Sequence, residues 1–303
     1  MAVAKRIFLF ITINILVIVS LSIILSLFHV QPYLTQYGID YKSLMIFCLV
    51  WGMGGAFISL ALSRIMAKWM MGVKLIPADT NDPSLKNLYR VVEDLAKQAG
   101  LPVTPEVGIY QSPEVNAFAT GPSQRRSLVA VSSGLLQKMN QKQLEGVLAH
   151  EITHIANGDM VTMTLIQGVI NAFVMFLARV LAYIFSSLMR SREENSSFGG
   201  SMSYILMVFF FEIVFMLLGS IIIAWFSRIR EYRADSGGAQ LAGREKMISA
   251  LEALKEFTTA KAVAKAHPSL DALKISSPKK SSFYMLFASH PPLEKRIERL
   301  KGA

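Results

Sequence analysis

HEITHIANGDMVTMTLIQGVINAFVMFLARVLAYIFSSLM, residues 150–189, joins the two signals that decide the fold. The stretch begins with the pattern His-Glu-x-x-His, His150 to His154, which on a helix places both imidazoles on one face. It continues from Val161 to Met189 as an apolar run in which Arg179 is the only charge. A helix of about 20 apolar residues crosses the hydrocarbon layer of a membrane. The chain therefore combines a candidate metal site with a membrane span.

Three further apolar runs have the length of a membrane span. They cover residues 7–28, 43–63 and 202–227, and the last contains Glu212 as its only charge. A cleaved signal peptide is the alternative for the first run, but its apolar core would be only about 7 to 15 residues long. The composition agrees with a membrane protein, because 52% of the 303 residues are hydrophobic and only 17% are charged. The sequence predicts four transmembrane helices.

The basic charge of the chain indicates how these helices are oriented. A net charge of +10 fits an anionic membrane surface, since no aromatic-rich basic motif or zinc-finger spacing points to nucleic acid. Basic residues cluster before the first predicted span and after the second and the fourth: Lys5, Arg6, Arg64, Lys68, Lys74, Arg228, Arg230 and Arg233. By the positive-inside rule we expect both termini and both large polar segments in the cytoplasm.

Two charges inside predicted spans are expected to meet. Arg179 lies ten residues before the end of its run, and Glu212 lies ten residues after the start of the next. An antiparallel hairpin would place them at similar depth, and ionisable residues within a membrane usually find a partner. The sequence predicts an ion pair that locks the two helices, and it leaves open a role of these charges in substrate handling.

The polar segments 67–160 and 228–303 are expected to form one α+β domain, into which the hairpin 161–227 is inserted; residues 1–66 contain the first two spans. Apolar positions at helical spacing predict a helix over residues 84–99, begun by Asp82-Pro83. Three short stretches, 107–110, 116–120 and 127–131, predict a small antiparallel sheet. Asn140 and Gln143 form a capping-box pattern at the start of the helix that carries His150 and His154.

The metal site must use histidine and carboxylate, because the chain has a single cysteine, Cys48, within an apolar run. Two histidines that merely cap or pack a helix are the alternative. A catalytic zinc normally takes three protein ligands and leaves a fourth position for water. Glu231 is the best third ligand, because it follows the run 202–227 by four residues and His154 precedes the next-to-last span. We therefore expect a metal site close to the membrane surface.

Two carboxylates complete this interpretation. Glu151 can reach a water in the open metal position, where a general base is needed. Asp235 lies one helical turn after Glu231 and can accept a hydrogen bond from a metal-bound histidine, His150 rather than His154. A solvated surface carboxylate is the alternative for Asp235.

Four segments of the chain resemble the HtpX family of membrane-integrated zinc metallopeptidases, relatives of the CAAX prenyl proteases. They are Asn116-Ala117-Phe118-Ala119-Thr120-Gly121, the stretch from His150 to Asp159, the stretch from Ser227 to Asp235, and Ser289-His290-Pro291-Pro292-Leu293. The resemblance covers nearly the whole chain and includes every catalytic position. It implies a zincin-type metalloprotease domain at the cytoplasmic face of a bacterial inner membrane.

The resemblance also assigns roles to residues. It implies one Zn²⁺ per chain, held by His150, His154 and Glu231, with Glu151 as catalytic base. It implies that the strand containing Asn116, Ala117 and Phe118 holds the substrate backbone, although an ordinary core strand is the alternative. It implies that His290 donates a hydrogen bond to the oxyanion, although a histidine before two prolines can simply end a loop.

The expected activity is endopeptidase cleavage of damaged or misfolded membrane proteins, as part of quality control under envelope stress. The partners are then membrane-protein or peptide substrates and the lipid bilayer, without nucleic acid. Two alternatives remain: a non-catalytic membrane adaptor or chaperone with a structural zinc, and a peptidase acting on prenylated C-termini. A structural zinc would be closed by four protein ligands, and the sequence offers no strong fourth ligand.

Overall fold

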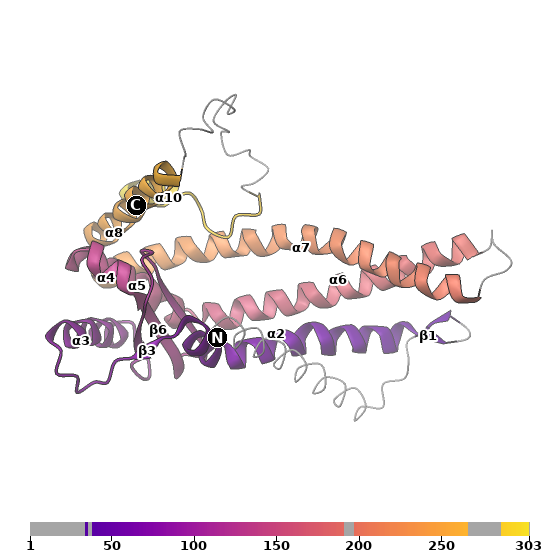
Figure 1. The fold of residues 1–303 in the computed structure, drawn as a ribbon, viewed down its shortest axis with the longest axis horizontal. Helices are drawn as coiled ribbons and strands as arrows, with labels where there is room; N and C mark the ends of the chain where they lie inside the picture. The colour runs from indigo at the N-terminus through magenta and orange to yellow at the C-terminus, as the bar shows by residue number, and fades with distance from the viewer. Residues whose placement is uncertain (1–33, 36–37, 191–196, 266–285, 303) are drawn as a thin grey trace. The chain divides into compact units, whose positions relative to one another are not determined.

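The computed structural model describes residues 34–35, 38–190, 197–265 and 286–302 (Figure 1). The chain divides into two compact units, which we call the apolar unit and the polar unit. The apolar unit is built from Met1–Ser59 and Met163–Ile223, and the polar unit from Leu60–Thr162 and Ala224–Ala303. The predicted first span, residues 7–28, lies outside the described residues.

Three described helices are long and apolar enough to cross a membrane. They are α2 (Tyr41–Met71), α6 (Asp159–Arg190) and α7 (Ser197–Ala242), and they contain the predicted runs 43–63, 161–189 and 202–227. A short antiparallel hairpin of β1 (Leu34–Thr35) and β2 (Gly38–Ile39) precedes α2. Helix α7 does not end with the apolar run but continues to Ala242, so Glu231 and Asp235 lie on the same helix as Glu212.

Helices α2 and α6 of the apolar unit lie side by side (Figure 1), and small residues allow them to approach closely. Helix α2 approaches α6 so closely at Gly52 that a Cβ there would lie 2.8 Å from the Cα of Ala172. Where helices lie between lipid tails that are as apolar as their own side chains, such close approach provides much of the attraction between them. The small residues therefore determine which faces of α2 and α6 meet.

The predicted ion pair is present in the apolar unit. Arg179 Nη1 donates to Glu212 Oε1 at 2.7 Å and also to the carbonyl oxygen of Met175 at 3.1 Å. The guanidinium carbon lies 5.5 Å from the ring centre of Phe47. The pair thus joins α6 to α7, and the Phe47 contact adds α2.

The sheet of the polar unit corrects one prediction. Four strands lie in the order β3-β4-β6-β5, where β3 is Lys74–Leu75, β4 Glu106–Tyr110, β5 Ala117–Ser123 and β6 Arg126–Ser132. The β3–β4 and β5–β6 pairs are antiparallel, but β4 and β6 are parallel, so the expected purely antiparallel sheet is wrong. The reason is that the β5–β6 hairpin adds to the sheet through its second strand, which runs in the direction of β4.

The strand order leaves β5 at the edge of the sheet and β6 in its centre. Strand β5 runs past residue 120, the end of the predicted stretch, and includes Gly121 and Pro122; its pairing with β6 has a register irregularity between Thr120 and Ser123. Strand β6 is buried on both faces: Val129 and Val131 belong to the main core, and Leu128 and Ala130 to a smaller cluster with Val73 and Tyr110. The metal-site helix packs on the main-core side.

The helices of the polar unit begin where their capping residues predict. Helix α3 (Pro83–Gln98) is capped by Asp82, whose carboxylate accepts from the backbone N–H groups of Ser84 and Leu85. Helix α5 (Gln141–Ala156) starts with the capping box of Asn140 and Gln143. The described residues of the unit form three further helices, none of which was predicted: α4 (Ser133–Lys138), α8 (Arg244–Lys265) and α10 (Leu293–Gly302).

A two-residue turn separates the metal-site helix from the next one. Helix α5 ends at Ala156, Asn157 caps it, and Gly158 adopts φ 65°, a backbone conformation that favours glycine. Helix α6 then begins at once with Asp159. The tight turn brings the first side chain of α6 back towards the last turn of α5.

The Arg179–Glu212 pair gives a prediction for stability. Arg179→Glu or Glu212→Arg alone places two like charges together among apolar helices, where each unpaired charge costs at least about 2.5 kcal/mol. We expect either single variant to lower the thermal unfolding temperature of the protein in detergent, and the double exchange to restore most of the loss. A double variant as unstable as the single variants would contradict the pairing.

Candidate metal centre

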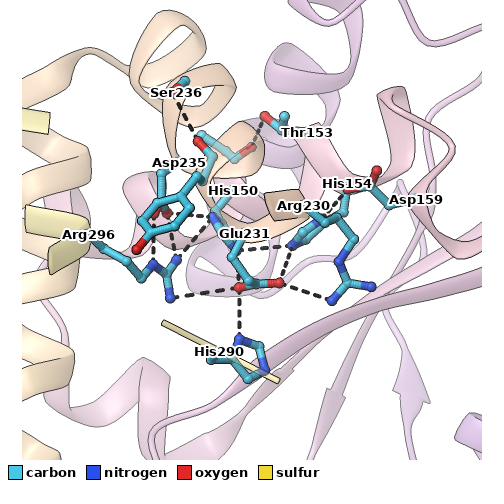
Figure 2. Close-up of polar contacts among 12 residues, drawn as sticks. His150, Thr153, His154, Asp159, Arg230, Glu231, Asp235, Ser236, His290 and Arg296 are labelled. Carbon is cyan, nitrogen blue, oxygen red and sulfur yellow. Dashed lines mark hydrogen bonds and ion pairs between the residues drawn. The ribbon is translucent and has the colours of Figure 1, made fainter. Parts of the chain in front are cut away.

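Two histidines from one helix and one glutamate from another form a buried cluster (Figure 2). His150 and His154 lie one turn apart on α5, with 7% and 9% of their surfaces exposed. Glu231 comes from α7 and is only 1% exposed. The structure therefore brings together the three side chains that the sequence selected as metal ligands, although Glu231 follows His154 by 77 positions in the chain.

The three side chains are close enough to share one metal ion, because one ligand atom from each lies within 4.8 Å of the other two. His150 Nε2 lies 3.1 Å from His154 Nε2 and 3.5 Å from Glu231 Oε2, and His154 Nε2 lies 3.4 Å from Glu231 Oε1. Ligands held roughly 2.1 Å from a tetrahedral metal stand about 3.4 Å apart. Two imidazoles and one carboxylate are also a donor set that divalent transition metals accept. The residues present thus fit a metal ion.

Each histidine is held by a carboxylate at its other ring nitrogen. His150 Nδ1 lies 3.1 Å from Asp235 Oδ1, which is the contact expected from the sequence. His154 Nδ1 lies 2.6 Å from Asp159 Oδ2, a contact that the sequence analysis missed. A carboxylate in this position fixes the tautomer so that Nε2 offers its lone pair to a metal. Both imidazoles are therefore oriented towards the same point.

Asp159 owes its position to the turn at Gly158. It is the first residue of α6, where the helix dipole favours a negative charge, and it lies 7% exposed beside the last turn of α5. The signal in the sequence was a carboxylate five residues after His154 and directly behind a glycine. A helix prediction alone could not show that the chain folds back there.

Arg296 is the second residue that the sequence analysis missed. It donates from Nε and Nη2 to the two oxygens of Asp235 at 2.8 and 2.6 Å, and its Nη2 lies 3.4 Å from His150 Nδ1. A bidentate arginine neutralises Asp235 and fixes its plane. The helical spacing of Leu293, Ile297 and Leu300 in α10 could have indicated its burial, because Arg296 falls on the same face of the helix.

Glu231 is surrounded by positive or potentially positive groups. Arg230 Nη2 donates to Oε1 at 3.0 Å, and His290 Nδ1 lies 2.8 Å from Oε2 (Figure 2). A nearly buried carboxylate requires such partners, because an uncompensated charge away from water costs several kcal/mol. The proposed oxyanion donor His290 therefore contacts a candidate metal ligand, which the sequence did not predict.

The segment that carries His290 is bound to α7 through Arg228. Arg228 Nη1 donates to the carbonyl oxygens of Leu286 and Ala288, at 3.2 and 2.9 Å. His290 itself is 62% exposed at its side chain, so it stands at the mouth of the site rather than in the core. An exposed imidazole beside the metal cluster can reach a bound substrate.

Glu151 lies between the two histidines in sequence and partly exposed in the structure. Its negative charge contributes to raising the pKa of both His150 and His154, so its carboxylate lies within electrostatic reach of the cluster. The Glu151 carboxylate makes no hydrogen bond with any other described residue. Glu151 is therefore free to act on a water at the metal position.

The strand predicted to hold substrate lies at the sheet edge beside α5. Ala117 and Phe118 begin β5, and Asn116 precedes it. Tyr110 accompanies this segment: its hydroxyl donates to the carbonyl oxygen of Asn116 at 3.5 Å, and its ring lies 5.6 Å from that of Phe118. Burial and, more weakly, the charge of Glu151 raise the pKa of Tyr110. The start of the edge strand thus contacts Tyr110, and β5 packs against α5, the helix that carries Glu151.

Without a metal, protons hold the cluster together. Burial by itself would lower the pKa of His154, but hydrogen bonds to Asp159 and Glu231 raise it to about 9. Burial likewise opposes a charge on His150, while Asp235 and Glu231 raise its pKa above the ordinary value. A charged His154 then lies between the carboxylates of Asp159 and Glu231 at neutral pH. A metal must displace these protons to bind.

Comparisons with known proteins agree with this geometry. Residues 84–303 match the family model of peptidase family M48. The chain is 50% identical over 299 residues to "Protease HtpX homolog" of Methylacidiphilum infernorum, covering 98% of each chain, and 50% identical over 298 residues to "Protease HtpX" of Shewanella pealeana, covering 98% of this chain and 99% of that one. The crystal structure of S. mikatae Ste24p shares the fold with a TM-score of 0.63 at 18% identity; the match covers 98% of this chain but 64% of that chain.

The raised histidine pKa predicts how metal affinity changes with pH. Because the pKa of metal-free His154 is about 9, a proton competes with the metal below that pH, and affinity should rise from pH 6 towards pH 9 and then level off. The same proton stabilises the metal-free fold fully below the unfolded pKa near 6.5 and no longer above about 9. Competition titrations with a chelator of known proton affinity measure the effect.

Asp159→Asn provides the control for this prediction. It removes the main partner that raises the pKa of His154, so the pH at which affinity levels off should move down. Affinity that is independent of pH in the unsubstituted protein, or an Asp159→Asn profile that is unshifted, would contradict the assignment of the displaced proton to His154.

Proposed function

This chain belongs to peptidase family M48 as a membrane metallopeptidase of the HtpX type, and from that premise we propose that it is a zinc-dependent endopeptidase of the bacterial inner membrane that cleaves damaged or misfolded membrane proteins at the cytoplasmic face. The observation that carries the proposal is the buried cluster of His150, His154 and Glu231, whose ligand atoms all lie within 4.8 Å of one another. Zinc suits these donors. Within the described residues no fourth His, Cys, Asp or Glu joins the cluster, which supports a catalytic rather than a structural ion.

The site residues divide the chemistry among themselves. His150, His154 and Glu231 would hold the zinc ion, which when bound would supply a Lewis acid for the scissile carbonyl and for water. Glu151 accepts the proton of the attacking water and passes it to the nitrogen of the leaving amine, so that no covalent intermediate with the protein is required. Asp235 and Asp159 keep the two imidazoles in the tautomer that binds metal.

His290 stands where charge develops on the substrate. Its imidazole lies at the mouth of the cluster, within 2.8 Å of Glu231 and open to solvent. When a peptide occupies the site, we propose that this imidazole turns its donor to the oxygen of the tetrahedral intermediate. Arg228, which binds the carbonyl oxygens of Leu286 and Ala288, keeps the segment of His290 within reach.

The edge strand β5 supports binding of an extended substrate. One side of β5 pairs with β6, and its other side is the edge of the described sheet. An extended peptide can add to such an edge by main-chain hydrogen bonds, which recognise any sequence. Asn116, Ala117 and Phe118 lie at the end of the strand nearest Tyr110. Recognition of the backbone alone suits an enzyme that acts on many unfolded segments.

Basic residues support a cytoplasmic active site. Arg64 and Lys68 lie near the C-terminal end of α2, and Arg228, Arg230 and Arg233 follow the apolar part of α7. The loops between paired spans carry few such residues, so the positive-inside rule directs the polar unit and both termini to the cytoplasm. Substrates would then be membrane proteins with segments reaching that face of the bilayer.

Replacing the catalytic base tests the mechanism. Glu151→Gln should lower peptide cleavage by purified protein by a factor of about 10² to 10⁴, because a general base contributes that much, while one zinc per chain remains bound. Glu145→Gln on the same helix, which removes only a pairing with Lys246, should leave cleavage unchanged. Cleavage of a quenched fluorescent peptide and metal analysis are the measurements. Chelation should abolish activity, and added zinc should restore it.

Retained activity in Glu151→Gln would refute the role of this carboxylate. Loss of zinc together with activity would mean that Glu151 holds the ion instead of acting on water.

Replacing His290 distinguishes two roles: stabilising the oxyanion and holding Glu231. If it stabilises the oxyanion, His290→Ala should reduce kcat by about 10²- to 10³-fold with little change in KM or zinc content. Kinetics and metal analysis of the same preparation provide the measurement. A zinc affinity that falls in parallel with kcat would instead show that His290 acts only by holding Glu231.

A further inference from the structure

A second cavity lies beside the metal cluster in the polar unit. It has a volume of about 500 Å³ and is lined by α5, α7 and α10, through Thr153, Asn157, Ile229, Tyr232, Arg233, Ser236, Gly237, Gln240 and Arg299. None of the metal-cluster residues lines it. Each of the three helices presents one face to the cluster and a neighbouring face to this cavity, which we call the arginine pocket.

The helical spacing explains why the two sites are adjacent yet separate. Three residues along a helix turn a side chain by roughly 300°, which is the next face around the axis. His150 is followed by Thr153 at this spacing, His154 by Asn157, and Arg296 by Arg299. The same helices therefore separate the two sites. One face of each helix points to the metal cluster, and the next face lines the arginine pocket.

The charge of the arginine pocket is purely positive. Arg233 and Arg299 both line it, and no aspartate or glutamate among the described residues does. Neither arginine has an ion-pair partner within the described residues, in contrast to Arg230 and Arg296, which bind carboxylates of the metal cluster. Two guanidinium groups without a counter-charge at one cavity attract an anion.

The remaining lining supplies polar groups suited to an oxyanion. Arg299 lies over the ring of Tyr232, with its guanidinium carbon 4.7 Å from the ring centre, so its fork is held in place. The side-chain amides of Asn157 and Gln240 and the hydroxyl of Tyr232 make no hydrogen bond with any other described residue. Planar guanidinium groups bind the oxygens of phosphate in pairs, and neutral donors complete the shell.

The position of the pocket along the chain favours a lipid as the source of the phosphate. Ile229, which lines it, follows the predicted membrane run 202–227 by two residues on the same helix. Basic pockets at the cytoplasmic end of membrane helices bind the headgroups of anionic phospholipids. The cavity is also larger than a single phosphate ion needs. We propose that the arginine pocket binds the phosphate of an anionic phospholipid headgroup.

Native mass spectrometry of the full-length Glu151→Gln protein in neutral detergent tests the proposal without self-digestion. Phosphatidylglycerol should bind in a 1:1 complex, and Arg233→Gln with Arg299→Gln should weaken this binding about tenfold or more, because charge-assisted hydrogen bonds are lost. A matched control, Arg244→Gln with Lys295→Gln, removes two exposed positive charges outside the pocket and should leave binding unchanged. Arg233→Gln alone should show part of the loss, and since Arg233 is exposed and unpaired it does not endanger folding.

Two further arms identify the source of the phosphate. Phosphatidylcholine, which carries a compensating positive charge, should bind more weakly than phosphatidylglycerol, and millimolar inorganic phosphate should not displace the lipid. Equal losses in the pocket and control variants would overturn the site. Displacement of the lipid by inorganic phosphate, or equal binding of the two lipids, would overturn the headgroup assignment.

Discussion

The polar unit depends on one nearly buried carboxylate. Glu231 is 1% exposed and carries a negative charge that the interior would not tolerate alone. Two imidazoles, Arg230 and His290 surround it within 2.8 to 3.5 Å, and these partners come from α5, α7 and the segment before α10. The electrostatic requirement of one side chain thus holds together segments that lie far apart in the chain, and a metal ion at the same point meets that requirement.

Residues around the cluster hold its two histidines in position. Asp235 and Asp159 each hold one histidine, and Arg296 in turn holds Asp235 with two hydrogen bonds. A ligand whose second nitrogen is fixed cannot rotate away from the metal, so its entropy is already lost before the ion binds. The neighbouring faces of α5, α7 and α10 line the arginine pocket, and its two arginines have no ion-pair partner in the described part of the chain.

Helix α7 gives each unit its key acidic residue. Glu212 pairs with Arg179 within the apolar unit, and Glu231 joins the two histidines within the polar unit. Both charges are tolerated for the same reason, since each meets a partner where water is scarce. The continuity of the helix past the apolar run places the third ligand without a loop, and a helix fixes direction more firmly than a loop does.

The sequence by itself determined what depends on neighbours along the chain. Hydropathy marked the runs that became α2, α6 and α7; the four-residue spacing put His150 and His154 on one face, and Asn140 with Gln143 marked the start of α5. Glu231 could be chosen because two adjacent spans return the chain to its starting side. Only the tertiary structure decided the parallel pairing of β4 with β6, the fold-back of Asp159, and the contacts of Arg296 and His290 with residues about 60 positions away. Those contacts follow from how separate elements pack in three dimensions, and no periodicity along a single element records which partner lies opposite.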